Sequence, residues 1–381
     1  MSELYQLPDG WEWVEWDGIV DIKNGKHYKD VINPDGKYPI YGSGGVINFA
    51  DEYLCNEDSV IIGRKGTINN PIFVKEKFWN IDTAFGLEAN RNLLVPMFLY
   101  YFTQNFNFLD LNTATTMPSL TKSNLQKIKM PLPPLTEQKR IVQKLNALFE
   151  RIDKAIVLLQ KNIDAADSFM NSVLNDVFSN LEQNYGTQNI LDGVNIGSRV
   201  GYKPTLIDGK VPFIGMSDID EKSGINTKYV LEDYEKVSKG KVKFERNAVL
   251  VGKITPCTQN NKTTIVPTEI DGGFATTEVY ALHSKENMYP FYLNYFMRSK
   301  NVNDYLVSTM VGATGRQRVP SESIRALKIS IPTIDIQKRA VLYFDNISAQ
   351  IEQVKSAQQQ KMQNFLDLKS SILDQAFHGK L

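Results

Sequence analysis

The sequence is poor in the residues that build disulfide frameworks, metal clusters and nucleophilic catalytic sites. Its 381 residues include two cysteines, Cys55 and Cys257, and three histidines, His27, His283 and His378. Two cysteines this far apart along the chain indicate neither a disulfide scaffold nor a thiolate metal cluster. No pattern pairs a histidine with a nucleophile, so we expect neither a metal site nor a catalytic triad.

Long apolar runs are also missing. No stretch of the chain is long and apolar enough to cross a bilayer. The first ten residues are polar and do not have the basic-then-apolar order of a signal peptide. A hydrophobic content of 42% and a charged content of 23% are normal for a soluble globular protein. We therefore expect a cytoplasmic protein that has no membrane partner.

Motifs of nucleotide-consuming and DNA-modifying enzymes are absent as well. The chain has no Walker motif, which argues against NTP hydrolysis. The stretch Asn70-Pro71-Ile72-Phe73 resembles the Asn-Pro-Pro-aromatic motif of adenine methyltransferases, but it lacks the second proline. No glycine-rich cofactor loop precedes it, so we interpret it as a turn followed by a strand. We expect the chain to be no enzyme and to carry no cofactor of its own.

An excess of charge of one sign is missing from the whole chain but not from its parts. The 43 basic and 43 acidic residues cancel, which argues against a chain that coats nucleic acid by charge alone. Residues 1–135 hold 12 basic and 16 acidic residues, a net charge of −4. Residues 179–334 hold 19 basic and 16 acidic residues, a net charge of +3. The first part is expected to bind DNA only weakly without a basic partner.

The chain contains an internal two-fold repeat. The triplet Gln138-Lys139-Arg140 recurs 199 residues later as Gln337-Lys338-Arg339, and no gap is needed between about residue 113 and residue 178. Upstream the offset falls in steps to 194, 189 and 173, so insertions separate shared elements. Shared elements with variable loops are what a scaffold with adjustable surfaces would show.

Two long helices follow from the spacing of apolar residues. Residues 136–178 contain no glycine and no proline, and their apolar positions alternate by three and four residues, as in a coiled coil. Thr136 and Asp335 stand where helix N-caps are expected. We predict a first domain over residues 1–135, a helix over 136–180, a second domain over 181–334 and a helix over 335–381. A 43-residue helix would be about 65 Å long.

Each long helix has one apolar stripe that must be buried. The simplest solution is one helix packed against the other, and we favour an antiparallel pair because the chain must return to begin the second domain. The alternative is that each helix packs on its own domain. The seam proposed for the second helix includes Val354 and a polar residue, Gln358, which would cost stability but fix the register.

The two domains are predicted to be mixed α/β (α+β), with short β-like runs separated by turns. Each ends near an aromatic helix, Pro96–Phe106 and Pro290–Arg298, which we assign to core packing. Polar loops are the candidate reading surfaces, although each could be an ordinary solvated turn. Glycines would let the backbone approach a phosphate, and arginine can grip guanine. The candidate DNA-contacting residues are Lys26, Ser43, Arg64, Lys65, Thr67, Thr115, Thr116, Arg199, Lys203, Lys253, Thr255, Arg316, Gln317 and Arg318.

Several stretches together carry a family resemblance. They are Leu7-Pro8-Asp9-Gly10-Trp11-Glu12-Trp13, Pro39-Ile40-Tyr41-Gly42-Ser43-Gly44-Gly45, Pro131-Leu132-Pro133-Pro134 before Glu137-Gln138-Lys139-Arg140-Ile141, and Gln375-Ala376-Phe377-His378-Gly379-Lys380-Leu381. In this order, and with the two-fold repeat, the chain resembles the specificity subunits of Type I restriction–modification systems over essentially its whole length.

The resemblance implies a fold, partners and cofactors. The fold is two target-recognition domains in tandem, separated by two long helices that form an antiparallel coiled coil acting as a spacer. Each domain would read one half of a bipartite, asymmetric target in double-stranded DNA. Two methyltransferase (modification) subunits would dock around the helices and carry S-adenosylmethionine, and restriction subunits using ATP and Mg can join. The chain itself would hold no cofactor.

Two other functions compete with DNA recognition. A coiled-coil interaction scaffold without direct DNA reading would explain the helices and the neutral charge, but not the two loop-rich domains at equivalent places. A methyltransferase or nuclease in its own right would need the motifs that are missing. Exchanging residues 1–135 for the same region of a relative discriminates, because only a DNA reader would change the methylated sequence.

Overall fold

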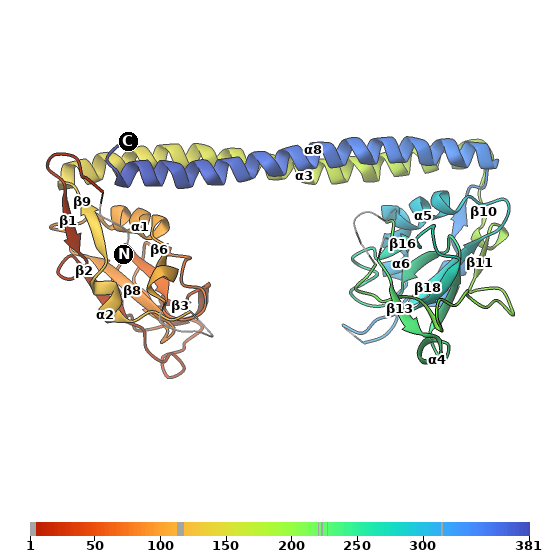
Figure 1. The fold of residues 1–381 in the computed structure, drawn as a ribbon, viewed down its shortest axis with the longest axis horizontal. Coiled ribbons are helices and arrows are strands. Elements are labelled where there is room, and N and C mark those ends of the chain that lie inside the picture. The colour runs from red at the N-terminus through yellow and green to blue at the C-terminus, as the bar shows by residue number, and fades with distance from the viewer. Residues whose placement is uncertain (1–4, 113–117, 220, 222–223, 227, 314) are drawn as a thin grey trace. The chain divides into compact units, whose positions relative to one another are not determined.

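The computed structural model describes residues 5–112, 118–219, 221, 224–226, 228–313 and 315–381. The chain divides into two compact units (Figure 1). Unit 1 consists of Met1–Gln160 and Gln359–Leu381, and unit 2 consists of Lys161–Gln358. Each unit therefore contains one of the predicted domains together with one part of each long helix.

Unit 1 is built on three small sheets. The four-stranded sheet has the order β2-β8-β5-β6 and is antiparallel throughout. The second sheet has the order β4-β3-β7, in which β3 and β7 run parallel, and β1 pairs with β9. The strands are β1 (Glu12–Glu15), β2 (Val20–Asn24), β3 (Tyr38–Gly42), β4 (Gly45–Ala50), β5 (Ser59–Gly63), β6 (Ile72–Val74), β7 (Trp79–Asn80), β8 (Ala84–Ala89) and β9 (Lys129–Leu132).

Unit 2 repeats this plan. Its antiparallel sheet has the order β11-β18-β15-β16, its second sheet the order β13-β12-β17-β14 with β12 and β17 parallel, and β10 pairs with β19. The strands are β10 (Gln188–Asn189), β11 (Val194–Ile196), β12 (Lys210–Ile214), β13 (Val230–Asp233), β14 (Val242–Glu245), β15 (Val249–Gly252), β16 (Thr263–Ile265), β17 (Gly272–Ala275), β18 (Val279–Ser284) and β19 (Lys328–Ile329). The matching strand orders confirm the internal repeat.

Short helices complete each unit. In unit 1 they are α1 (Pro96–Asn105), the 3-10 turn η1 (Phe108–Leu111) and α2 (Lys122–Gln126). In unit 2 they are η2 (Ile190–Asp192), α4 (Tyr234–Val237), α5 (Pro290–Arg298), α6 (Lys300–Ser308) and α7 (Ser321–Arg325). Both α1 and α5 begin with a proline at the first helical position, where its missing N–H costs nothing.

The aromatic helices pack inside the core, as the sequence predicted. Phe98 and Phe102 on α1 hold the ring of Phe377 with centroid distances of 5.1 and 5.5 Å. In unit 2 Tyr292 and Phe296 on α5 hold Phe178 in the same way, at 5.3 and 5.5 Å. The residues that match in the repeat therefore make the same contacts, and none of these rings is free to stack on a base.

The two long helices are α3 (Leu135–Tyr185) and α8 (Ile334–Phe377). Both begin one residue earlier than predicted, and α3 ends five residues after the predicted residue 180, whereas α8 ends four residues before the predicted residue 381. The carbonyl of Pro134 accepts hydrogen bonds from the N–H groups of Glu137 and Gln138, so Thr136 lies within the first turn and is not the N-cap. The same correction applies to Asp335, because Thr333 supplies the matching carbonyl. Pro134 and Thr333 therefore stand at the N-cap positions, because their carbonyls accept the first hydrogen bonds of α3 and α8.

In both units the two helices pack antiparallel. In unit 1 the start of α3 contributes Ile141 and Leu145, and the end of α8 contributes Leu373 and Ala376, to one buried cluster. In unit 2 the end of α3 and the start of α8 meet instead, with Val173 against Phe344. Ion pairs cross between the helices, from Lys369 to Asp153 at 2.9 Å in unit 1 and from Lys355 to Asp167 at 2.8 Å in unit 2.

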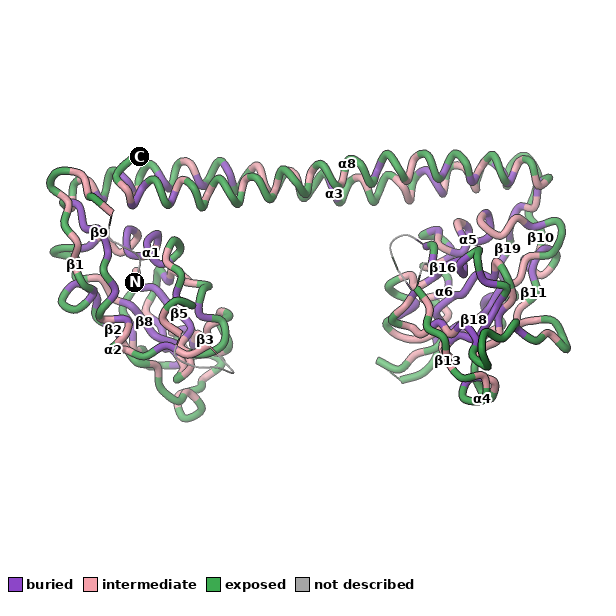
Figure 2. Tube along the Cα trace, in the orientation of Figure 1, coloured by how far each residue is buried: buried purple, intermediate pink, exposed green. Residues whose placement is uncertain are grey.

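Burial along the helices follows the predicted seam with one exception. Figure 2 shows buried positions recurring along one side of each long helix. Val354, which was predicted to lie in the seam, is 46% exposed, and its neighbour Lys355 is the more buried of the two. The alternative of packing on the domain also holds at the helix ends, because the aromatic helices α1 and α5 lie against them. Domain and helix therefore share one core in each unit.

A buried glutamine joins each domain to its long helix. Gln138 accepts a hydrogen bond from the N–H of Val95, the residue before α1, and donates to the carbonyls of Leu93 and Pro133, all at 2.8–2.9 Å. Gln337 makes the corresponding three bonds to Tyr289, Asn287 and Pro332, each at 2.8 Å. Both side chains have no exposed surface. The glutamine of the repeated Gln-Lys-Arg triplet thus fixes each domain to its long helix.

Candidate nucleic-acid interface

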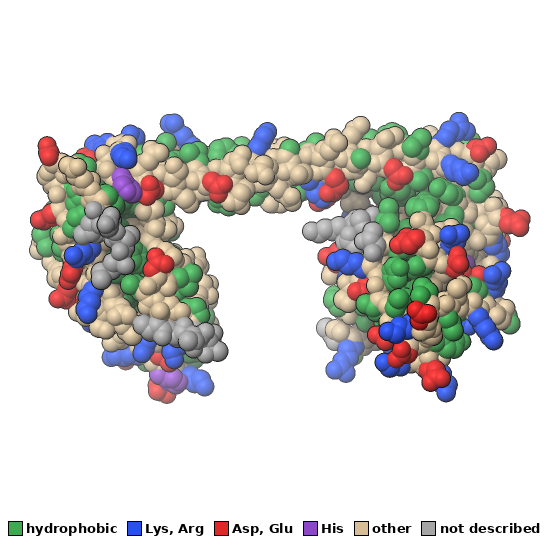
Figure 3. Space-filling view, in the orientation of Figure 1, with side chains coloured by type: hydrophobic (Ala, Val, Ile, Leu, Met, Phe, Trp, Pro, Cys, Tyr) green, Lys and Arg blue, Asp and Glu red, His purple; other side chains and the backbone are tan. Residues whose placement is uncertain are grey.

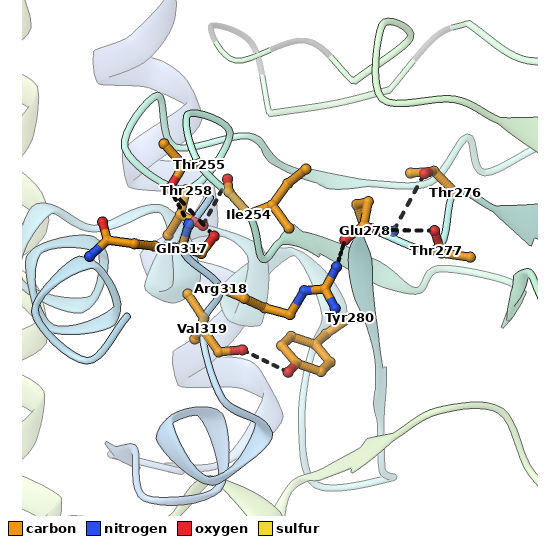
Figure 4. A network of polar contacts seen from close by, with 10 residues as sticks. All are labelled: Ile254, Thr255, Thr258, Thr276, Thr277, Glu278, Tyr280, Gln317, Arg318 and Val319. Atoms are coloured by element: carbon orange, nitrogen blue, oxygen red, sulfur yellow. Dashed lines mark hydrogen bonds and ion pairs between the residues drawn. The ribbon is translucent and has the colours of Figure 1, made fainter. Parts of the chain in front are cut away.

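In unit 2 two candidate loops that are far apart in sequence form one surface (Figure 4). The loop after β15 contains Lys253 and Thr255, and the second loop ends at Val319. The N–H of Thr255 donates to the carbonyl of Gln317 at 3.0 Å, and the N–H of Val319 donates to the carbonyl of Lys253 at 2.8 Å. The N–H of Gln317 in turn donates to the Thr255 hydroxyl. Four candidates, Lys253, Thr255, Gln317 and Arg318, are thereby brought together.

A charged network lies on this surface. Arg318 forms an ion pair with Glu278, with 2.6 Å between Nη2 and Oε2. The ammonium of Lys253 lies 4.9 Å from the centre of the Tyr280 ring, and burial lowers the pKa of this lysine while Glu278 opposes that shift. The Tyr280 hydroxyl donates to the carbonyl of Val319 at 2.8 Å. Arg318 is thus paired directly with the Glu278 carboxylate, and the same carboxylate acts on Lys253 through its charge.

The network borders a hollow of about 440 Å³. Its lining consists of Ile254, Thr255, Glu278 and the run from Gly315 to Arg318. Arg316 and Arg318 are exposed and Gln317 is half-buried, so polar groups border both the hollow and the solvent. Arginine and glutamine are side-chain types that read base edges, which makes this the best-formed candidate interface in unit 2.

Unit 1 uses the same backbone frame with other side chains. The N–H of Arg64 donates to the carbonyl of Thr83 at 2.8 Å, and the N–H of Leu120 donates to the carbonyl of Arg64 at 2.9 Å. These bonds match those of Lys253 with Glu278 and Val319. Lys65 lies opposite Ser119, as Ile254 lies opposite Arg318. The loop with Arg64 and Lys65 is therefore also joined to the segment that follows residue 117.

Glycine in the first loop has a different purpose from the one predicted. A Cβ atom on Gly63 would lie 2.0 Å from the carbonyl oxygen of Thr67. The close approach that requires glycine is therefore made by the chain itself and not by a phosphate. Gly66 has a φ of +74° with open space around it, so its backbone conformation is what favours glycine there.

Among the residues that the structure describes, the remaining candidates make none of the contacts of these two networks. Ser43 is half-buried beside Gly63, and Thr67 and Lys26 are exposed, with the N–H of Lys26 bonded to the Asn80 carbonyl. Thr115 and Thr116 lie outside the described residues. In unit 2 Arg199 is exposed and pairs with Glu245 at 3.1 Å.

Lys203 is exposed and lies close to Arg199 in the chain. Nothing joins these two residues to the Lys253 network among the contacts described.

Sequence reasoning missed three residues that organise these surfaces: Glu278, Tyr280 and Thr83. A search for basic and amide side chains that could contact bases does not select a glutamate such as Glu278. The contacts of the Tyr280 hydroxyl depend on segments far apart in the sequence, so no local pattern predicts them. The signal that could have found Glu278 is its position directly before β18, which matches that of Thr83 before β8. An alignment of the two repeats through this point would have placed both beside the candidate loops.

No metal centre accompanies the interface in the described part of the chain. No group of three or more histidine, cysteine, aspartate or glutamate residues there could hold a metal ion.

On the faces visible in Figure 3, basic and acidic side chains are interspersed on each unit. Among the described residues, no helix is both long and apolar enough to span a membrane. The interspersed charges on these faces favour DNA contacts by individual side chains over binding through a broad electropositive surface.

Comparison with known proteins identifies the family. A family model for the Type I restriction modification DNA specificity domain matches residues 8–158 and 195–362. A putative type I restriction enzyme specificity subunit from Haemophilus influenzae is 30% identical over 36% of this chain, which spans 37% of that relative. The EcoBI specificity subunit of Escherichia coli is 21% identical over 100% of this chain and 88% of its own length.

Solved structures share the fold. A chain studied for complex assembly and conformational transition of the type I R-M system superposes with a TM-score of 0.72 and 18% identity, covering 99% of this chain and 100% of that one. The HsdS subunit from Thermoanaerobacter tengcongensis gives a TM-score of 0.53 at 19% identity, with 100% and 99% coverage. Because the family model matches both halves, the chain belongs to the Type I restriction modification DNA specificity domain family, as a non-catalytic specificity subunit.

Proposed function

We propose that the two domains read the two halves of a bipartite, asymmetric sequence in double-stranded DNA. One observation carries the proposal: both units build the same backbone frame and place different side chains on it. Arg64 and Lys65 occupy the frame in unit 1, whereas Lys253, Thr255 and Arg318 occupy it in unit 2. A common frame with unlike side chains supports two readers of related design and different sequence preference.

The proposed contacts divide between backbone and bases. Exposed lysines such as Lys26, Lys65 and Lys203 would contact phosphates, which position a protein on DNA without reading its sequence. Arg64, Arg316, Gln317 and Arg318 would reach base edges in the major groove, where arginine recognises guanine and glutamine recognises adenine. Thr67 and Thr255 would add short hydrogen bonds at the rims of these loops. Ser43, beside Gly63, would flank the surface of unit 1, and Arg199, beside Glu245, would contact DNA apart from the Lys253 network.

The partners of this chain are part of the proposal. Two methyltransferase subunits would dock around the paired helices and bring S-adenosylmethionine, and restriction subunits would bring ATP and Mg where they join. Exposed apolar side chains on α3, Val157 and Leu158, are 54% and 59% accessible and support a partner on that helix. A chain without net charge would borrow much of its affinity for phosphates from these partners.

The test is an exchange of residues 1–135 for the same region of a relative, expressed with the methyltransferase. Methylated adenines are then mapped across the host genome for the parent, the exchanged chain and a gene deletion. We expect the deletion to remove one bipartite motif and the exchange to alter one half of it. A motif that survives the exchange unchanged would support the scaffold alternative and contradict DNA reading by this chain.

A further inference from the structure

Arg318 stands on a backbone that is held from both sides. Its N–H and carbonyl form a reciprocal pair of hydrogen bonds with Val311, each 2.9 Å. On the other side the neighbouring residues Gln317 and Val319 bond to Thr255 and Lys253. The start of this side chain is therefore fixed, and only its rotamers decide where the guanidinium points.

Glu278 removes much of that rotamer freedom. Its Oε2 lies 2.6 Å from Arg318 Nη2, while its Oε1 accepts a hydrogen bond from the Thr277 hydroxyl at 3.2 Å. The backbone of Glu278 is itself anchored, because its carbonyl accepts from the Lys253 N–H at 3.0 Å. The Glu278 side chain is 28% exposed and that of Arg318 is 57% exposed, so the carboxylate is the more buried partner of the ion pair. Figure 4 shows Arg318 extended toward it.

We propose that Glu278 is a positioning residue that holds Arg318 ready to read a guanine in the half-site of unit 2. This inference rests on the proposed function. A guanidinium offers five N–H donors in a planar fork. Glu278 engages Nη2, which leaves the other donors for the N7 and O6 acceptors of guanine. An arginine fixed in advance loses less side-chain entropy when it binds.

Electrostatics argues against a simpler role for this acid. A carboxylate on a surface that approaches phosphates weakens binding to every DNA sequence alike. Partly exposed ion pairs also contribute little to folding stability. Glu278 therefore weakens binding to DNA of any sequence without a matching gain in folding stability. The benefit that accounts for this acid is the orientation of Arg318.

The pair is confined to unit 2. Thr83 occupies the place of Glu278 in unit 1, and Ser119 occupies the place of Arg318. Unit 1 has no acid–arginine pair at this point of its described frame. Loss of Glu278 should therefore affect one half of the target and leave the other half unchanged.

The experiment replaces Glu278 in the full chain, assembled with its methyltransferase in the host. The half-site of unit 2 is the half that persists when residues 1–135 are exchanged. Variants are Glu278→Gln, Glu278→Ala and Arg318→Lys, which keeps the charge but loses the fork. Asp304→Asn is the matched control, because it removes one acid from an exposed ion pair with Lys300 on α6. Methylation is compared between the cognate motif and sites with one substituted base.

We expect all three variants to lose discrimination at the same guanine, by roughly ten-fold for a good bidentate contact. Discrimination in the other half should not change, and Glu278→Gln should bind non-specific DNA more tightly in a competition assay. Glu278→Gln behaving like Asp304→Asn would overturn the proposal, as would an equal loss in both halves. The exchange of residues 1–135 assigns the two halves and judges the proposed function, whereas the comparison of Glu278→Gln with Asp304→Asn judges this proposal.

Discussion

At the scale of single residues, Gln138 and Gln337 bind their domains to the long helices through amides that lie entirely within the protein. Each side chain uses its acceptor and both donors, and every partner is a backbone group. Water cannot replace a missing partner at a site without exposed surface. The position of α1 and α5 on the helices depends on these bonds because Val95 and Tyr289 directly precede them.

We predict that Gln138→Ala lowers the free energy of unfolding by about 3 kcal/mol. The substitution leaves one N–H and two carbonyls buried without partners, and each such group costs about 1–3 kcal/mol, reduced by local relaxation. Gln337→Ala should have a similar effect through unit 2. The measurement is urea unfolding followed by circular dichroism. Gln143→Ala on the exposed face of α3 is the control, and a loss no larger than in that control would contradict the assigned role.

Sequence could supply the types of the reading residues but not their grouping. Arginine, lysine and glutamine in glycine-containing loops predicted two polar surfaces, on which Lys65, Arg316 and Arg318 are exposed, whereas Arg64, Lys253 and Gln317 are half-buried. The joining of Lys253 to Val319 depends on hydrogen bonds between segments some sixty residues apart, for which no local pattern exists. Glu278 was missed for the same reason, since its significance comes from the arginine beside it. Whether any of the candidates touches DNA stays a prediction.

At the scale of elements, periodicity was the most informative signal. A repeat of three and four residues over more than forty positions predicts a long helix with one buried stripe, and α3 has that stripe. The helix starts were less predictable, because the N-cap positions fall on Pro134 and Thr333, two residues before Thr136 and Asp335. Short strands were predicted as a class, but their pairing comes from contacts between distant segments.

The seam of α3 should tolerate changes very unevenly. Leu145 is fully buried between domain and helix, whereas Leu158 on the same helix is 59% exposed. We expect Leu145→Ala to lower the free energy of unfolding by about 3 kcal/mol, because a cavity forms in a packed core. Leu158→Ala should change it by less than about 0.5 kcal/mol. Thermal and urea unfolding of both variants measure the difference.

Leu158→Ala has a second readout that Leu145→Ala does not share. If the exposed apolar residues of α3 bind a methyltransferase subunit, the variant should fold normally and assemble less well. Co-purification with the methyltransferase, compared with Gln143→Ala on the same helix, tests this. Normal assembly by Leu158→Ala would remove this position from the docking surface.

At the scale of the whole molecule, charge sets the terms for DNA binding. The chain is neutral overall, its first domain is acidic, and several of its cations are already paired within the protein. Affinity for DNA without sequence preference grows with the number of phosphates that free cations neutralise. The 43 acidic residues oppose such contacts, so the isolated chain should bind DNA weakly and lose that binding as the salt concentration rises.

We therefore expect the isolated chain to bind duplex DNA with a Kd of about 10⁻⁴–10⁻⁶ M at physiological salt, with no preference for the target over random sequence. Sequence-specific binding should emerge only in complex with the methyltransferase, whose cations would supply the phosphate contacts that this chain lacks. Fluorescence anisotropy of labelled duplexes at several salt concentrations measures both states.

Lys203→Ala should reduce the salt dependence by about one unit of slope in the complex if Lys203 contacts a phosphate. Lys154→Ala, which removes a cation from α3 outside both domains, should leave the slope unchanged. Tight, sequence-specific binding by the isolated chain would show that its own loops suffice, and the dependence on partner charge would be wrong.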